Sequence, residues 1–229
     1  MNNIIEDITG IIQMGTPLDA IAEPTYAVMS VTGQTKATGD KPEWSAEGKG
    51  MAFGSVVHRT IEMLGKGLPE SEIEDTVRFI ADEEGMVADL ISEATRVIRS
   101  VMASELWQRS LRARRRLFEV PLMIRMNTDE VSVSSDAESA ASEVAAALEG
   151  TGSNKYAYVR GVIDFLFEEE DGWVIVDFKT DSVTEEKLQP FTDFYRPQVQ
   201  AYAWEWEQAF GFKVKEVGLY FIQLGVWAT

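Results

Sequence analysis

The chain is poor in the residues that most often build disulfides, metal sites and nucleic-acid surfaces. It contains no cysteine and one histidine, and its 21 Lys and Arg residues stand against 38 Asp and Glu residues, a formal net charge of −17. The absence of cysteine excludes disulfide bonds, thiolate-bound zinc and cysteine-ligated iron–sulfur clusters. An acidic chain repels the phosphate backbone, so the net charge argues against unaided binding of DNA.

Long apolar runs are also missing. The sequence has no stretch of about 18 apolar residues and no signal-peptide pattern, so we expect a soluble protein of the cytoplasm without membrane contact. The chain does have enough apolar material for a core, 45% of its 229 residues. This length and composition suit one α/β domain with embellishments.

The most informative stretch is GVIDFLFEEEDGWVIVDFKTD, residues 161–181. Two runs rich in Val, Ile and Phe meet at an acidic turn, which predicts a β-hairpin. Both faces of this hairpin are mainly apolar, as in a sheet packed between helices. One face carries only apolar side chains: Ile163, Phe165, Phe167, Val174, Val176 and Phe178.

The other face of the hairpin carries two carboxylates and an amine. A turn at Asp171-Gly172 places Asp164 opposite Lys179, and a turn shifted back by one residue places Asp164 opposite Asp177. In either register Asp164, Asp177 and Lys179 share a face, because side chains alternate along a strand. Buried charges are costly unless they are paired or bind a metal. The three residues therefore form either a structural salt bridge or a site for Mg²⁺ or Mn²⁺, where the lysine can hold a water.

Helical patterns precede the hairpin. Residues 50–67 have the apolar spacing of a helix that stops at its last glycines. This helix carries His58, and a lone histidine on such a helix is usually a packed or surface residue. Residues 69–117 predict two or three further helices, the longest from about Met86 to Leu117, which cover the sheet as an N-terminal helical part. Trp107 suits packing there better than stacking on a base.

Basic side chains gather just before a predicted strand. They are Arg109, Arg112, Arg114, Arg115 and Arg116. This cluster fits either a DNA contact or the solvated end of a helix. Residues 117–126, LFEVPLMIRM, alternate as a strand, and Glu119 on it lies either at the surface or in the site.

After the hairpin, residues 180–190 are expected to form a polar connection beside the groove. A helix is predicted from near Pro197 to Gly211, and Gln198 and Tyr202 share one of its faces because they are four residues apart. Residues 214–225 predict a last strand that pairs near the first strands.

Two segments carry no recognisable chemistry. Residues 1–48 contain scattered Gly and Pro and are expected to form an irregular lead-in or linker, with a short helix over 2–13. Residues 127–155 are rich in Ser, Ala, Glu and Gly and are expected to form a long loop insertion, with a short helix near 137–148.

The ordered motifs resemble a known family. Gly161-x-x-Asp164 followed by Asp177-x-Lys179 resembles the PD-(D/E)XK nuclease superfamily. The string VDFKTD followed by YRPQVQAY at 195–202 is similar to the C-terminal nuclease domain of AddA- and RecB-type helicase–nucleases. The resemblance implies a restriction-endonuclease-like fold over residues 49–229, a central mixed β-sheet flanked by helices.

The resemblance also implies a role for each candidate side chain. His58, in a G-x-x-x-H motif, is expected to ligate a metal together with Asp164, Asp177 and the backbone carbonyl of Phe178. Lys179 would orient the attacking water and stabilise charge on the phosphate. Glu119, in an E-x-P strand, is expected to support Lys179 or a second ion. Gln198 and Tyr202 are expected to position the scissile strand, and Arg196 is expected to contact a phosphate.

The activity implied is Mg²⁺- or Mn²⁺-dependent hydrolysis of phosphodiester bonds, without an iron–sulfur cluster. We expect a DNA exonuclease domain that cuts single strands delivered by an AddA- or RecB-type helicase domain or subunit, in double-strand-break repair and recombination. Two alternatives are a non-catalytic DNA-binding or scaffold domain and a different metal-dependent hydrolase on a similar sheet.

Overall fold

The computed structural model describes residues 26–30, 49–127 and 156–229. The short helices predicted within 2–13 and 137–148 lie outside these residues. The chain divides into two compact units, Met29–Ile124 with Val159–Thr229, and Met1–Val28 with Arg125–Tyr158. The described helices and the hydrophobic core lie in the first unit.

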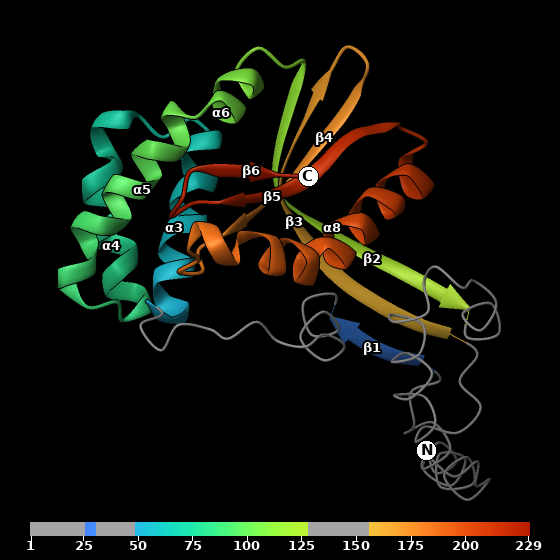
Figure 1. Cartoon of the computed structure of the whole chain (residues 1–229), viewed down its shortest axis with the longest axis horizontal. Coiled ribbons are helices and arrows are strands. Elements are labelled where there is room, and N and C mark those ends of the chain that lie inside the picture. Colours follow the sequence, from blue (N-terminus) through green and yellow to red (C-terminus); the bar gives the residue numbers. More distant parts are fainter. Residues whose placement is uncertain (1–25, 31–48, 128–155) are drawn as a thin grey trace, which may run out of the picture. The chain divides into compact units, whose positions relative to one another are not determined.

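The described strands form one six-stranded mixed sheet (Figure 1). In sheet order they are β1 (Tyr26–Ser30), β3 (Tyr156–Glu169), β4 (Gly172–Lys179), β5 (Val214–Phe221) and β6 (Val226–Ala228), and β2 (Arg115–Asn127) also pairs with β3. Strands β4 and β5 are parallel, so the chain must cross over between them, and helix α8 (Leu188–Phe210) makes this crossing. The predicted α/β class is confirmed.

Strands β3 and β4 form the predicted hairpin. Their backbone pairs run from Glu169–Gly172 to Phe165–Val176. The turn is therefore the one shifted back by a residue from Asp171-Gly172. Asp164 and Asp177 follow directly after the last pair on neighbouring strands, which brings the two carboxylates to the same end of the hairpin.

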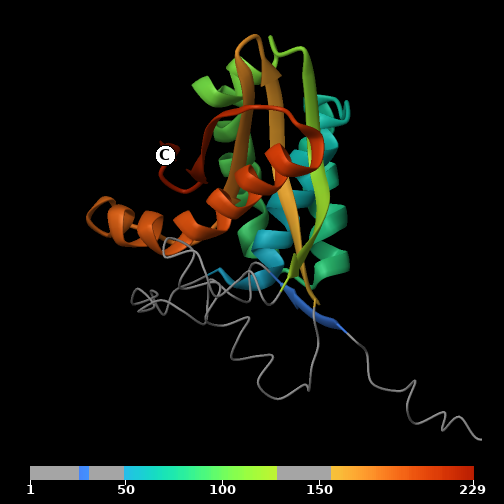
Figure 2. The same ribbon diagram turned by 90° about the vertical axis from the view of Figure 1, so that its right-hand side faces the viewer.

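Helices cover both faces of the sheet (Figures 1 and 2). Helices α3 (Gly50–Gly65), α4 (Ile73–Glu84), α5 (Ile91–Ala103) and α6 (Glu105–Ser110) lie on one face, with 3₁₀ turns at Glu70–Glu72 and Ala88–Leu90. Their apolar side chains share a core with Phe165, Phe167 and Val176 of the hairpin. Helix α8 packs on the other face, against Leu219 and Phe221 of β5. None of the described helices combines the length and the apolar character that crossing a membrane requires.

Residues 69–117 contain three α-helices, which agrees with the two or three predicted, but the long amphipathic stretch from about Met86 to Leu117 is broken and ends in β2. Helix α5 ends at Ala103, because Ser104 takes an extended conformation and its side chain accepts a hydrogen bond from the backbone N–H of Trp107. This N-cap starts the short helix α6. Trp107 is buried against Phe118 and Phe165, so it packs as expected.

The predicted start of α8 near Pro197 is also wrong. The helix begins at Leu188, so the polar connection expected over 180–190 ends early, at a 3₁₀ turn over Glu185–Lys187. A proline inside a helix removes a hydrogen bond and costs about 3 kcal/mol. Burial offsets this cost, because the first turns of α8 pack on the sheet through Phe191, Phe194, Tyr195 and Val199. The helix ends as predicted, with Gly211 in the left-handed conformation at φ 67°.

The strand predicted over 214–225 is shorter and pairs differently. Strand β5 ends at Phe221, and the chain turns into β6, which pairs with it antiparallel. Strand β5 pairs with β4 on its other side, not with the first strands of the chain. This parallel pairing follows from the long α8 crossover, which short-range sequence patterns do not specify.

Two members of the arginine cluster are held by carboxylates of the sheet. Arg109 lies between Glu169 and Glu216, with Nη2–Oε2 distances of 3.1 Å and 2.8 Å. The Nε of Arg115 lies 2.6 Å from Glu168 Oε2. These contacts tie α6 and the first residue of β2 to the turn end of the hairpin and to β5. This structural role differs from both alternatives expected from the sequence, a DNA contact and a solvated helix end.

Replacing Arg109 by alanine is expected to lower the free energy of unfolding by about 1–3 kcal/mol, because two partly buried carboxylates each lose an ion pair. Glu169 keeps its contact with Lys215, and Glu216 keeps the hydrogen bond from the Trp227 indole. The guanidinium side chain is 24% exposed, which places the effect between those of surface and buried pairs. Urea denaturation followed by circular dichroism measures it. Arg112→Ala, at an exposed position of the same cluster, is the matched control and should change stability by less than about 0.5 kcal/mol. Equal stability of the two variants would rule out this structural role.

Candidate functional site

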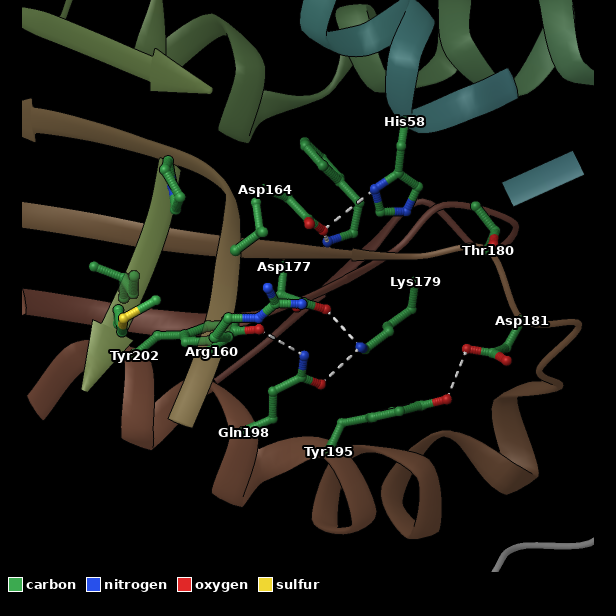
Figure 3. A pocket seen from close by; sticks show the side chains of 16 residues that line it. His58, Arg160, Asp164, Asp177, Lys179, Thr180, Asp181, Tyr195, Gln198 and Tyr202 are labelled. Atoms are coloured by element: carbon green, nitrogen blue, oxygen red, sulfur yellow. Dashed lines mark hydrogen bonds and ion pairs between the residues drawn. The ribbon is translucent and has the colours of Figure 1, made fainter. Parts of the chain in front are cut away.

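A cavity of about 790 Å³ opens at the end of the hairpin away from its turn (Figure 3). Side chains from α3, β2, β3, β4 and α8 line it. The polar ones include His58, Arg160, Asp164, Asp177, Lys179 and Gln198. The cavity therefore brings together residues that lie far apart in the sequence, from His58 to Tyr202.

Asp164 is fixed by a backbone hydrogen bond. The N–H of Phe178 donates to Asp164 Oδ2 at 2.7 Å, just beyond the last backbone pair of the hairpin. Burial, and after it the negative charge of Asp177, raises the pKa of Asp164 well above its ordinary value. Two neighbouring buried carboxylates favour a bound cation, because a cation offsets both burial and repulsion.

His58 reaches the site from helix α3. Its Nδ1 lies 3.5 Å from Asp164 Oδ2. A Cβ on Gly54, one turn earlier, would lie 3.2 Å from Thr180 Oγ1, so the glycine lets α3 approach the chain that leaves β4. Burial lowers the pKa of His58, which favours the neutral imidazole that can ligate a metal.

Glu119 points into the site from β2. Its carboxylate, the His58 ring and the Asp164 carboxylate each offer a ligand atom, and the three atoms lie within 4.8 Å of one another. Burial, and after it the charge of Asp164, raises the pKa of Glu119 to about 7. Among the described residues Glu119 is the non-glycine residue with a positive φ, 50°. Such a conformation is strained and often marks a functional site.

Lys179 is held from three sides (Figure 3). Its Nζ lies 2.7 Å from Asp177 Oδ2 and donates to Gln198 Oε1 at 3.1 Å. The ring of Tyr195 lies 3.8 Å from the same nitrogen, a cation–π contact. Gln198 Nε2 in turn donates to the Tyr202 hydroxyl at 3.0 Å. The ammonium is therefore fixed in position beside the carboxylates.

A hard divalent cation fits this donor set, because one imidazole nitrogen and several carboxylate oxygens converge. The closest group is His58, Glu119 and Asp164. Asp177, whose carboxylate contacts Lys179, and the carbonyl of Phe178 remain predicted ligands.

The remaining candidates divide into those at the cavity and those outside it. Gln198 and Tyr202 both line it, as the family resemblance implies, and their positioning of the scissile strand remains a prediction. Arg196 is not among its lining residues and lies 3.5 Å from Asp193, so its phosphate contact remains a prediction. Tyr195 was missed. With α8 begun at Leu188, its position three residues before Gln198 would have placed both on one helical face.

Known proteins are similar in sequence to this chain. A family model described as the PD-(D/E)XK nuclease superfamily matches residues 36–226. The A subunit of the ATP-dependent helicase/nuclease of Thermoanaerobacter sp. (strain X514) is 29% identical over 177 residues, which cover 77% of this chain and 13% of the relative. The protein of the same name from Carboxydothermus hydrogenoformans is 39% identical over 127 residues, 56% of this chain and 10% of the relative.

A third relative of that name, from Acetivibrio thermocellus, is 29% identical over 187 residues, 79% of this chain and 14% of the relative. The chain thus spans only a small part of the length of these relatives. The family model, in contrast, covers most of the chain, and Asp164, Asp177 and Lys179 line one cavity. The chain belongs to the PD-(D/E)XK nuclease superfamily.

Proposed function

We propose that the chain is a metal-dependent nuclease domain that hydrolyses the phosphodiester bonds of DNA. The observation that carries this proposal is the convergence of His58, Asp164, Asp177 and Lys179 at one open cavity, with the Glu119 carboxylate close to His58 and Asp164. A structural salt bridge alone accounts for Asp177 and Lys179, but it leaves the other three ionisable groups crowded without a purpose.

Each residue has a task in this reaction. His58, Glu119 and Asp164, with Asp177 beside them, would hold a divalent cation, which supplies Lewis-acid activation of a phosphate oxygen and of water. Lys179 orients the attacking water and stabilises the negative charge that develops on the phosphate. Asp177 and Gln198 keep the ammonium in place. Tyr202 fixes the amide of Gln198, since its hydroxyl accepts a hydrogen bond from it.

The proposed substrate is a DNA single strand, and the proposed partner is a helicase domain or subunit. The matched relatives are named as A subunits of an ATP-dependent helicase/nuclease, which supports a helicase partner. The place proposed for this activity is double-strand-break repair and recombination, as the family resemblance implies. A partner that delivers the strand also explains how a chain of net charge −17 can act on DNA. Degradation from a strand end, as an exonuclease, fits such delivery.

The second candidate is a non-catalytic DNA-binding or scaffold domain. The negative charge favours only the scaffold role, because it argues against unaided binding of DNA. A cleavage assay separates the two. The full chain is expected to degrade a labelled single-stranded oligonucleotide with Mg²⁺ or Mn²⁺ and to stop when EDTA is added. A helicase of the matched type, added in parallel, tests for dependence on delivery. Absence of cleavage with both ions, with and without the helicase, would overturn the nuclease proposal.

A further inference from the structure

One wall of the cavity takes no part in the chemistry above. It is formed by Arg160 and Val162 of β3 and Met123 of β2, all of which line the cavity. Val162 is 41% exposed and Met123 is 65% exposed, although both are apolar. Arg160 is also exposed and forms no ion pair with any residue that the structure describes. The wall thus offers this guanidinium next to two uncovered apolar side chains.

The wall continues directly from the candidate metal site. Arg160, Val162 and Asp164 alternate along β3 and so point to the same face of the sheet. At a rise of about 3.3 Å per residue, the Cα atoms of Val162 and Arg160 lie roughly 7 Å and 13 Å from that of Asp164. Figure 3 shows the Arg160 side chain extending into the cavity. A chain bound at Asp164 would therefore run along this wall.

The charges around the cavity make Arg160 the main candidate there for binding a second phosphate. The other long cationic side chain that lines the cavity is Lys179, which Asp177 and Gln198 already engage. Arg109, in the arginine cluster, is ion-paired at the turn end of the hairpin. In a chain of net charge −17, an exposed guanidinium beside a phosphodiester site is suited to a second phosphate.

We propose that this wall binds the strand next to the phosphodiester that is cut. Arg160 contacts a neighbouring phosphate, and Val162 and Met123 contact the face of a base. This inference rests on the proposed function and names the residues that would select its single-stranded substrate, because the face of a base is accessible only in an unpaired strand. Apolar contact with a base face also tolerates every base, so the wall selects single strands without reading sequence.

Binding of two matched probes tests the wall. Fluorescence anisotropy with Mg²⁺ compares a labelled oligothymidylate with an abasic deoxyribose-phosphate oligomer of the same length, using the full chain with Lys179→Ala to prevent cleavage. Arg160→Gln is expected to weaken binding of both probes about fivefold to tenfold and to lower the salt dependence by about one phosphate contact. Arg160→Lys, which keeps the charge, should recover most of the affinity.

The apolar pair is tested by Met123→Ser with Val162→Ser. This double variant should weaken binding of oligothymidylate about fivefold or more and leave binding of the abasic oligomer unchanged. Arg99→Gln, at an exposed position on α5, is the matched control for lost charge and should leave the affinity for both probes unchanged. All four substituted positions are exposed, so melting temperatures should match the parent.

Equal affinities for Arg160→Gln and Arg99→Gln would overturn the inference. So would a double variant that loses the same affinity for both probes, because a base contact cannot exist in the abasic oligomer. Cleavage by the parent, measured separately, distinguishes this failure from failure of the proposed function. If the parent cleaves DNA but Arg160→Gln binds the probes as tightly as the parent, only the proposed role of the wall is contradicted. If the wall variants weaken binding but the parent does not cleave DNA, only the nuclease proposal is contradicted.

Discussion

Replacing Lys179 by alanine is expected to lower the rate of single-strand cleavage by about 10²–10⁴-fold. The Lys179 side chain is 10% exposed, and its ammonium lies against Asp177, Gln198 and the ring of Tyr195, so its position is fixed before substrate arrives. Asp177→Ala should cause a loss of similar size, because it removes a carboxylate from the site and releases the ammonium.

Initial rates with Mn²⁺ on a labelled oligonucleotide measure this effect, and circular dichroism confirms that each variant folds. Lys179→Arg should not restore the rate, since a planar guanidinium does not fit the place of a compact ammonium. Lys213→Ala, at an exposed position before β5, is the control and should cleave at the parent rate. Cleavage by Lys179→Ala within about threefold of the parent would show that the lysine has only a structural role.

Phe165→Ala is expected to lower the free energy of unfolding by about 3–5 kcal/mol. The side chain is fully buried and packs between Phe118 of β2 and Phe178 of β4, with ring centroids 4.4 Å and 6.1 Å away. Phe118 precedes Glu119, and the N–H of Phe178 holds Asp164. The lost ring therefore leaves a cavity beneath two of the candidate metal ligands.

Urea denaturation of the two proteins measures this loss. Phe79→Ala provides a control of the same chemistry, because Phe79 on α4 is 64% exposed, and it should cost less than about 1 kcal/mol. Equal midpoints for Phe165→Ala and the parent would contradict the packing between the hairpin and β2. At temperatures where Phe165→Ala remains folded, we expect weaker metal binding, because Glu119 and Asp164 lose their shared support.

The hairpin shows which parts of the site can be predicted from local sequence patterns. Alternation placed Asp164, Asp177 and Lys179 on one face without knowledge of the fold, because a buried face specifies strand orientation. The register stayed open, since Asp171-Gly172 is a common turn. The structure shows a non-local reason for the glycine, because a Cβ on Gly172 would lie 2.9 Å from the Lys213 carbonyl. The glycine is required in β4 beside the start of β5 rather than in the turn.

Helix α8 and Glu119 show where such patterns fail. Pro197 is a strong start signal for a helix, yet burial of the preceding turns against β5 extends α8 back to Leu188. This error hid Tyr195, which packs over the Lys179 ammonium. The left-handed conformation of Glu119 has no sequence signature, and only the structure shows that its carboxylate meets His58.

Titration of Mn²⁺ into the full chain by isothermal calorimetry tests most directly whether His58, Glu119 and Asp164 hold a cation. The parent should bind Mn²⁺, less tightly at pH 6 than at pH 8, because Glu119, with a pKa of about 7, must lose its proton. Asp164→Asn should weaken binding at least about tenfold, whereas Glu74→Gln on the exposed surface of α4 should not. Equal affinities for the parent and Asp164→Asn would contradict a metal site at this cavity.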